Sequence, residues 1–385
     1  MNEWKDVSIG DLCETVSNTY KRKDQEVVLV NTSDVLEGKI LNHQPVPNEN
    51  LKGQFKKTFQ KDDILYSEIR PANKRYAFVD FESTDHYIAS TKLMVLRPKT
   101  ENVIPRYLYA VLTSKKVLDE MQHLAETRSG TFPQITFSSE LAPYHVKLPD
   151  FEAQKKIVSL LDSIEHKIET NIAINENLEQ QAKAIYQQMF IENMSPDWVE
   201  GSLRDIADIT MGQSPSGKSY NEDGIGTIFF QGRAEFGVRF PTIRLYTTEP
   251  KRMAYANDIL MSVRAPVGDL NIAHTDCCIG RGLAAIHSKT NHQSFVLYTM
   301  FSLRKQLDVF NGEGTVFGSI NRNSLNDMPI LIPSNETIEE FERIVAPMDA
   351  TIRNNYDEIC HLQAVRDSLL PRLMSGELDI SGLDI

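Results

Sequence analysis

Cysteine is scarce in this chain and follows no metal-binding pattern. Its four cysteines, Cys13, Cys277, Cys278 and Cys360, form no CxxC pair and have no histidine at metal-ligand spacing. Long apolar runs and a secretory leader are also missing from the sequence. We therefore expect a cytoplasmic protein with reduced, buried thiols and no membrane partner.

Catalytic signatures are missing as well. The sequence has no GxSxG elbow, no candidate Cys–His pair, and no glycine-rich cofactor loop followed by an Asn/Asp-Pro-Pro-aromatic motif. His274, His287 and His292 lack metal-ligand spacing. These absences predict a non-catalytic chain that holds no metal and no cofactor of its own.

Two motifs resemble catalytic sites without their context. Residues 212–219, GQSPSGKS, satisfy the phosphate-loop pattern, but Pro215 removes one amide and the following YNEDGIG cannot continue as a helix. Asp150, Glu165 and Lys167 are residue types found in nuclease sites. Glu165 and Lys167 are expected within one straight helix, where residues two apart face different ways. We interpret the first motif as a polar loop and the second as chance.

Basic residues are not in excess, since the formal net charge is −12. An acidic chain is at first sight a poor partner for nucleic acid. The segments 151–195 and 335–385 together carry −10 of this charge, so the remaining sequence is nearly neutral. Within it basic residues cluster at 20–23, 52–61 and 70–75. Such clusters either bind a polyanion or form an ordinary solvated face.

A heptad pattern occurs twice, in segments 184 residues apart. Apolar residues spaced alternately by four and three over four to five heptads are typical of a coiled coil. Asn171, Asn175 and Asn355 interrupt the pattern at its middle, where they either face solvent or fix the pairing of the helices. The predicted seam consists of Ile157, Leu161, Ile164, Ile168, Leu178, Ile185 and Met189 in the first copy, and Phe341, Val345, Met348, Ile352, Leu362, Leu369 and Leu373 in the second.

The sequence outside the two predicted helices is duplicated too. WKDVSIGDLCETV (4–16) reappears as WVEGSLRDIADIT (198–210), and KDDILYSEIRP (61–71) as ANDILMSVRAP (256–266). The repeat is domain-sized, which excludes a solenoid. We predict an α+β fold: two duplicated α/β domains separated by a long intramolecular antiparallel two-helix coiled coil with pseudo-two-fold symmetry. The predicted boundaries are 1–150 and 195–334 for the domains, 151–194 and 335–376 for the helices, and 377–385 for a tail.

The order of these motifs resembles the DNA-specificity subunit of type I restriction–modification enzymes. The resemblance rests on the two WxxxxLxDI starts, ILxSxRxPxG (259–268), CIGRGLAAI (278–286) and the ending SLLPRLMSGELDI (368–380). It covers the whole chain. It implies two target-recognition domains that each read half of a bipartite double-stranded DNA sequence. The helices would set the gap and bind two methyltransferase (modification) subunits and, through them, restriction subunits. S-adenosylmethionine, ATP and Mg²⁺ would belong to those partners.

Basic and polar residues of the domains are the candidates for DNA contact. Lys and Arg would neutralise phosphates, while Gln, Ser, Thr and Arg would read base edges. Each could instead be a surface ion-pair residue. The candidates are Lys21, Arg22, Lys23, Lys56, Lys57, Arg70, Lys74, Arg75, Thr131 and Phe132 in the first domain, and Ser214, Ser216, Lys218, Gln231, Arg233, Arg264 and Arg281 in the second.

Two alternatives and one irregularity remain. The chain could be a non-catalytic scaffold whose two domains bind proteins, or a nuclease with an unrecognised site. Arg366 interrupts the second seam and Pro371 lies near its end, so the last turns are expected to kink rather than pack.

Overall fold

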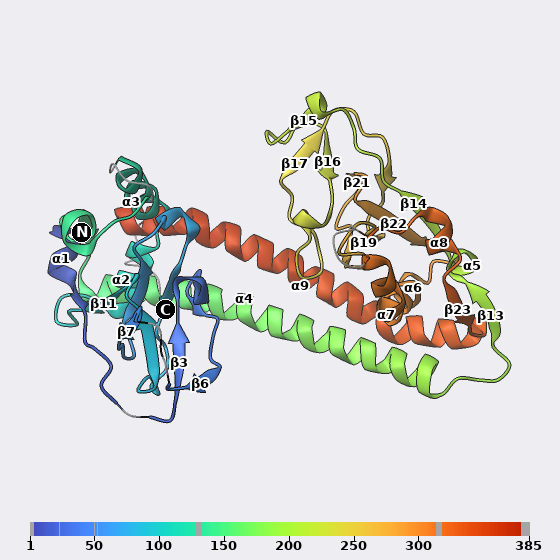
Figure 1. Cartoon of the computed structure of the whole chain (residues 1–385). Helices are drawn as coiled ribbons and strands as arrows, with labels where there is room; N and C mark the ends of the chain where they lie inside the picture. The colour runs from blue at the N-terminus through green and yellow to red at the C-terminus, as the bar shows by residue number, and fades with distance from the viewer. Residues whose placement is uncertain are drawn as a thin grey trace. The chain divides into compact units, whose positions relative to one another are not determined.

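The computed structural model (Figure 1) describes residues 4–22, 24–49, 51, 53–127, 133–312 and 318–378. It divides into two compact units, Met1–Thr170 with Glu358–Ile385, and Asn171–Asp357. The long helices α4 (Phe151–Tyr186) and α9 (Asn335–Ser375) each contribute residues to both units. The units thus divide both helices, whereas the sequence-based boundaries lie at the helix ends.

The first unit is built on two four-stranded sheets, ordered β2-β11-β8-β9 and β6-β3-β10-β7. The unit also contains helices α1 (Ile9–Leu12), α2 (Pro105–Leu112) and α3 (Lys115–Thr127). The strands are β1 (Lys5–Ser8), β2 (Cys13–Val16), β3 (Glu26–Val30), β4 (Val35–Leu36), β5 (Lys39–Ile40), β6 (Pro45–Pro47), β7 (Phe55–Lys57), β8 (Ile64–Ser67), β9 (Tyr76–Phe78), β10 (Tyr87–Ser90), β11 (Leu93–Pro98) and β12 (His145–Leu148).

The second unit has sheets ordered β14-β22-β19-β20 and β15-β17-β16-β21-β18. Its short helices are α5 (Leu203–Ile206), α6 (Gln293–Ser302), α7 (Arg304–Asp308) and α8 (Arg322–Asn326). The strands are β13 (Val199–Ser202), β14 (Ala207–Met211), β15 (Tyr220–Asn221), β16 (Thr227–Phe230), β17 (Leu245–Thr247), β18 (Met253–Ala254), β19 (Ile259–Ser262), β20 (Leu270–Ile272), β21 (Cys277–Ile279), β22 (Leu283–Ser288) and β23 (Pro329–Ile332).

The two units repeat one topology. The order β2-β11-β8-β9 corresponds to β14-β22-β19-β20, all antiparallel, and the parallel pair β3/β10 corresponds to β16/β21. β1 pairs with β12 as β13 pairs with β23. The repeated sequence motifs occupy equivalent strands, and the predicted mixed fold with two duplicated domains and paired long helices is confirmed.

Each repeat begins with the same capped turn. The Ser8 N–H donates to Asp11 Oδ2 at 3.1 Å, and the Asp11 N–H donates to Ser8 Oγ at 3.2 Å. Ser202 and Asp205 form the same reciprocal capping box in the second unit. A serine followed three residues later by a carboxylate satisfies otherwise unpaired amides at a helix start. This explains why SIGD and SLRD each place one helical turn between two strands.

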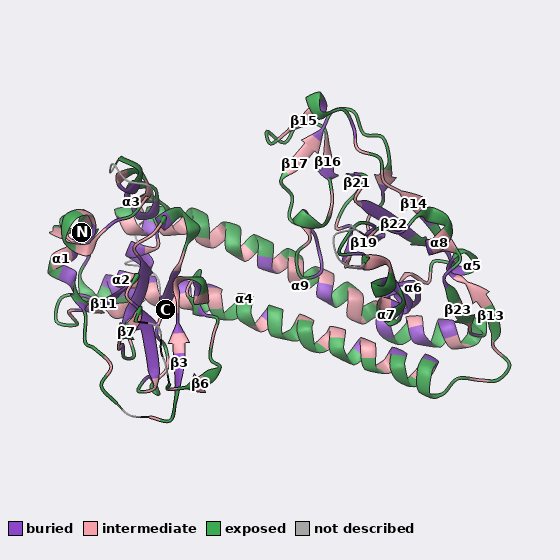
Figure 2. Ribbon diagram, in the orientation of Figure 1, coloured by how far each residue is buried: buried purple, intermediate pink, exposed green. Residues whose placement is uncertain are grey.

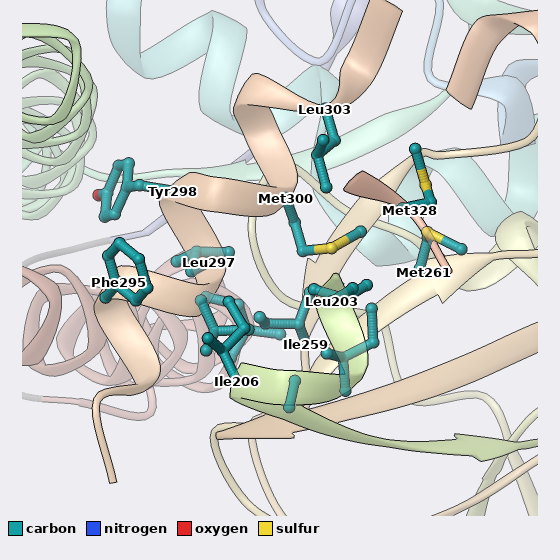
Figure 3. Packing of buried hydrophobic residues seen from close by; sticks show 14 of the residues in the cluster. Leu203, Ile206, Ile259, Met261, Phe295, Leu297, Tyr298, Met300, Leu303 and Met328 are labelled. Atoms are coloured by element: carbon teal, nitrogen blue, oxygen red, sulfur yellow. The ribbon is translucent and has the colours of Figure 1, made fainter. Parts of the chain in front are cut away.

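The central strands supply the core. β8 and β19 are buried along their whole length, so they carry the continuous apolar sequences ILYS and ILMS instead of an alternating pattern. In the second unit Ile259 and Met261 of β19 pack with Leu203, Phe295 and Met300 (Figure 3). Burying each such side chain stabilises the fold by roughly 1.5–3 kcal/mol.

Helices α4 and α9 pack on each other in the first unit. Ile164 and Ile168 of α4 form a buried cluster with Ile359 of α9, joined by Leu362 and Leu369. Figure 2 shows short buried stretches alternating with exposed residues along both helices. The ion pairs Glu165–Arg366, at 2.6 Å, and Lys167–Glu358, at 3.2 Å, flank the seam. The partner number falls as the α4 number rises, so the helices are antiparallel.

The same helices also pack in the second unit. Ala182 and Tyr186 of α4 share a buried cluster with Phe341, Val345 and Ile352 of α9. At the middle of the seam Asn355 Nδ2 donates to Asn175 Oδ1 at 2.8 Å, and Asn175 Nδ2 donates to the Ile352 carbonyl at 3.2 Å. Two of the three mid-seam asparagines therefore bond to each other across the helices. The remaining predicted seam residues of this unit, Leu178, Ile185, Met189 and Met348, pack partly buried against the cluster.

The C-terminal turns of α9 differ from the expectation. The helix continues past Pro371 to Ser375, and Leu373 is only 2% exposed in the core of the first unit, near Ile157 and Leu161. Arg366 donates to Glu165 of α4 at 2.6 Å. The expected loss of packing is wrong because the apolar contacts of Leu369 and Leu373 outweigh the one backbone hydrogen bond that a proline removes.

Candidate nucleic-acid interface

Five of the seven predicted contact residues of the second domain line one cleft. Its volume is about 250 Å³. The residues come from the ends of four strands in two sheets. Ser214 follows β14, Gln231 and Arg233 follow β16, Arg264 follows β19, and Arg281 lies between β21 and β22.

Close backbone packing builds this cleft. A Cβ on Gly280 would lie 2.7 Å from the Gln231 carbonyl oxygen, and one on Gly282 would lie 3.0 Å from the same atom. Contacts below 3.0 Å require the backbone to move, so glycine alone fits the position of Gly280. The Arg281 N–H donates to Ser214 Oγ at 3.2 Å. The sequence GRG therefore holds Arg281 against both Gln231 and Ser214.

The three arginines differ in their partners. Arg233 Nε donates to Asp269, which also accepts from Arg304 Nη1 at 2.6 Å. Arg264 and Arg281 are exposed, and among the described residues neither side chain has a hydrogen-bond or carboxylate partner. The cleft thus carries positive charge that the surrounding described residues do not neutralise.

The other two candidates of this domain lie outside the cleft. Ser216 and Lys218 are exposed beside the 3₁₀ turn η5 (Gly217–Ser219). Ser219, the hydroxyl that a phosphate loop would present to magnesium, is buried and bonded to Thr247 Oγ1 at 2.8 Å. η5 leads into strand β15, so the polar-loop interpretation holds and this motif lacks the helix that nucleotide binding requires.

A larger hollow, of about 800 Å³, is lined by α4, the segment around residues 233–237, strand β20 and helix α6 of the second unit. Its lining cations are Lys183, Arg304 and Arg233, which it shares with the smaller cleft, and each of them has a carboxylate partner. Arg304 donates to Asp269 and Asp308, and Lys183 donates to Glu179 at 2.6 Å. This hollow is therefore a weaker site for an anion than the smaller cleft.

Candidates of the first domain form two groups. Lys21, Arg22, Lys56 and Lys57 come together because Thr19 bridges to Lys57 of β7. Lys21 and Lys56 are exposed, and no ion pair with another described residue holds them. Arg22 pairs with Asp85 at 2.8 Å, with both side chains more than half exposed.

Lys57 has a structural role. Its Nζ donates to the carbonyls of Thr91, at 3.0 Å, and Leu93, at 2.8 Å. Burial lowers the pKa of this lysine. An ammonium bonded to two backbone carbonyls has little freedom to reach a phosphate.

The second group surrounds the 3₁₀ turn η2 (Pro71–Asn73). Lys74 pairs with Glu37 at 2.7 Å, and Arg75 donates to the carbonyls of Ser33 and Val35. The Arg70 side chain is exposed and has no described partner. Lys23, Thr131 and Phe132 lie outside the described residues.

One residue was missed by sequence reasoning. Lys92 lies in the loop between β10 and β11, which is equivalent to the β21–β22 loop that carries Arg281, and it pairs with Glu68 at 3.6 Å. Aligning YIASTKLMVLRPK (87–99) with CIGRGLAAIHSK (278–289) shows that the two loops correspond, which could have drawn attention to this lysine. Its ion pair distinguishes the first domain from the second.

Residues considered for catalysis have other partners. Asp150 Oδ1 accepts the Ala153 N–H at 2.8 Å at the start of α4, while Glu165 and Lys167 bond to α9. In the part of the chain that the structure describes, no group of three His, Cys, Asp or Glu side chains could hold a metal ion. None of the helices in that part is long and apolar enough to cross a membrane.

Known proteins resemble this chain over nearly its full length. The family model "Type I restriction modification DNA specificity domain" matches residues 1–180 and 196–360. The HindI type I restriction enzyme specificity subunit of Haemophilus influenzae is 28% identical, with 98% of this chain and all of the relative covered. A Methanocaldococcus jannaschii protein named as the MjaX specificity subunit is 30% identical over 83% of this chain and 79% of its own. A type I restriction–modification S subunit from M. genitalium shares the fold, with a TM-score of 0.58 at 14% identity, covering 99% of this chain and 97% of its own.

Proposed function

Since this chain belongs to the type I restriction modification DNA specificity family, as a non-catalytic specificity subunit, we propose that each globular domain reads one half of a bipartite DNA target. The helices α4 and α9 set the gap between the half-sites and dock two methyltransferase subunits. Restriction subunits join through that assembly. S-adenosylmethionine, ATP and Mg²⁺ act on the partner subunits.

The arginine cleft of the second domain is the observation that carries this proposal. Phosphates of B-DNA attract guanidinium groups, and base edges in the major groove are distinguished by Arg, Gln and Ser. The cleft gathers residues of all these types at strand ends of one domain. Guanidinium groups left unpaired in a recess suit an anionic ligand such as the DNA backbone.

The duplication supports two readers. Equivalent topologies present equivalent loops, and those loops carry different residues, such as Lys92 in one unit and Arg281 in the other. Each domain would therefore read a different sequence. Two heads contact the same face of B-DNA when their centres are separated by a helical repeat of about 34–36 Å.

The surfaces of the helices suit protein partners. The segments containing α4 and α9 are acidic, so they would be repelled by phosphates. In the second unit Ile172 and Ile174 of α4, and Ile344 of α9, are each 41% exposed. Exposed apolar residues within an acidic surface favour docking of protein and disfavour docking of DNA.

Co-expression with a methyltransferase subunit of the same system tests the proposal. Sequencing that detects modified adenine should reveal a bipartite motif with a fixed gap. Replacing residues 196–334 by the equivalent domain of a relative should change one half of that motif only. A change in both halves would refute independent readers.

The spacing role has its own test. Inserting seven residues into both α4 and α9 keeps the heptad seam in phase. The gap in the methylated motif should then lengthen while both half-sites stay the same. An unchanged gap would show that the helices do not set the spacing.

A further inference from the structure

We infer that the arginine cleft of the second domain is a clamp for a single DNA backbone phosphate, which fixes the register of this domain on its half-site. The inference rests on the proposed function and names the chemical group that the cleft takes. Its main members are Arg281, Arg264 and Arg233.

The shape and lining of the cleft favour a phosphate over a base edge. A side chain that reads the major groove must project into it, whereas a backbone phosphate projects from the duplex and can enter a recess. The cleft has three guanidinium groups, polar Ser214 and Gln231, and the backbone of Gly232 and Gly282. Among the described residues that line it, none is aromatic and could stack on a base.

Arg281 is held by its backbone while its side chain is exposed. Its N–H donates to Ser214 Oγ, the Gly280 N–H donates to the Phe230 carbonyl at 2.8 Å, and the Val263 N–H donates to the Gly282 carbonyl at 2.9 Å. These bonds fix the chain on both sides of the arginine. A guanidinium on a fixed backbone loses less freedom when it binds, which strengthens binding.

Arg233 is oriented by a carboxylate. Its Nε donates to Asp269, and its two Nη groups have no hydrogen-bond partner among the described residues. Because Asp269 is itself bonded to Arg304, its negative charge is shared between two arginines. Both Nη groups of Arg233 therefore remain available to an anion, in a fork that suits phosphate oxygens.

Arg264 supplies the third guanidinium. Its backbone bridges to Ser319, and it follows the buried strand β19. Residues 313–317, which precede Ser319 closely in sequence, are not among the described residues. The test therefore centres on Arg281.

A methylphosphonate scan of the recognised DNA provides the test. Each methylphosphonate removes the charge of one phosphate. The modified DNA is bound to the complex of the full chain with its methyltransferase subunits. One methylphosphonate near the second half-site should weaken the affinity of the complex for this DNA by roughly 10- to 150-fold. In Arg281→Ala, affinity for unmodified DNA should fall by a similar factor at every sequence, and the same methylphosphonate should have little further effect.

Arg281→Lys separates charge from geometry. Lysine keeps a positive charge but cannot bond two oxygens through a planar fork. We expect an intermediate loss of affinity with sensitivity to the same phosphate retained. Arg322→Ala is the matched control, because Arg322 is an exposed arginine of the same unit outside the cleft. Trp198 fluorescence checks that each variant remains folded.

Three results would overturn the clamp. One is an unchanged methylphosphonate penalty in Arg281→Ala. Another is a changed base preference in the second half-site, which would make Arg281 a base reader. The third is a scan of wild-type complex in which no single phosphate near that half-site matters. If the wild-type complex instead recognises no bipartite sequence at all, the proposed function itself fails.

Discussion

Replacing Arg239 should destabilise the second unit severely. Arg239 Nη1 donates to Glu179 of α4 at 2.9 Å, and Nη2 donates to Asp349 of α9. Its side chain is 8% exposed, against 22% for Glu179 and 18% for Asp349. Tyr298 also donates to Asp349, at 3.0 Å. One guanidinium from the loop after η6 (Arg233–Glu235) thus joins that loop to both long helices.

The size of the expected loss of stability follows from the burial of these charges. In Arg239→Met two largely buried carboxylates lose their cation, and removing one partner of a buried ion pair costs about 3–5 kcal/mol. For a unit of this size that lowers the melting temperature by about 6–20 °C. Burial already raises the pKa of Asp349, whereas Glu179 has a lowered pKa because Lys183 and Arg239 outweigh its burial. Without Arg239 both carboxyls would bind protons more readily, so the loss should be smaller at pH 5 than at pH 7.

Tryptophan fluorescence can measure this unit alone. Trp198 packs against the core of the second unit, 5.9 Å between ring centroids from Phe190, and the only other tryptophan, Trp4, packs in the first unit. In a Trp4→Phe background, urea unfolding followed by fluorescence therefore reports the second unit.

Two variants complete the design. Arg204→Ala removes an exposed ion pair with Asp327 in the same unit and should cost less than about 1 kcal/mol. The triple variant Glu179→Gln, Arg239→Met, Asp349→Asn removes all three charges and should recover part of the loss. If Arg239→Met costs no more than Arg204→Ala, the buried bridge does not stabilise this unit and the reasoning is refuted.

Three further predictions follow from single contacts. Lys56→Ala should weaken DNA binding at all sequences and, if it removes one phosphate contact, reduce the slope of log affinity against log salt concentration by roughly 0.9. Lys57→Ala should mainly lower the stability of the first unit, by about 1.5–3 kcal/mol in Trp4-monitored unfolding. Equal effects of the two variants on the salt dependence would contradict this division. Gly280→Ala should destabilise the second unit and weaken DNA binding, because a Cβ would meet the Gln231 backbone. In the control Gly217→Ala the new Cβ has open space, so stability should change by less than about 0.5 kcal/mol. A Gly280→Ala variant with unchanged stability would show that the cleft can relax. Asn355→Ala should cost about 0.5–1.5 kcal/mol in Trp198-monitored unfolding through loss of the amide bond across the helices, and a stabilised variant would refute that bond.

The duplicated architecture could be predicted because it depends on patterns that survive in one dimension. The heptad seam, the two tryptophan starts and the apolar ILYS and ILMS strands each have a short-range physical cause. The prediction at Pro371 is wrong for the opposite reason. Whether a proline ends a helix depends on what its neighbours pack against, and the core around Leu373 is assembled from distant segments.

The candidate contact residues likewise could be proposed from the sequence, but their roles could not. Residue type alone selected Arg281, Arg233 and Lys57 together. Their roles diverge only after folding, when Asp269 approaches Arg233 and the carbonyls of Thr91 and Leu93 approach Lys57. Pairing between residues far apart in sequence has no local signal, so composition overestimates the number of free cations.

By itself the sequence determined the family resemblance, the order of domains and helices, and the antiparallel pairing, because periodicity and duplication are properties of the chain. Only the tertiary structure decided which cations remain unpaired and which of them share a cleft. Charges act over distances set by the fold, and strand ends from two sheets meet around Gly280 only when the backbone of Gln231 lies against it.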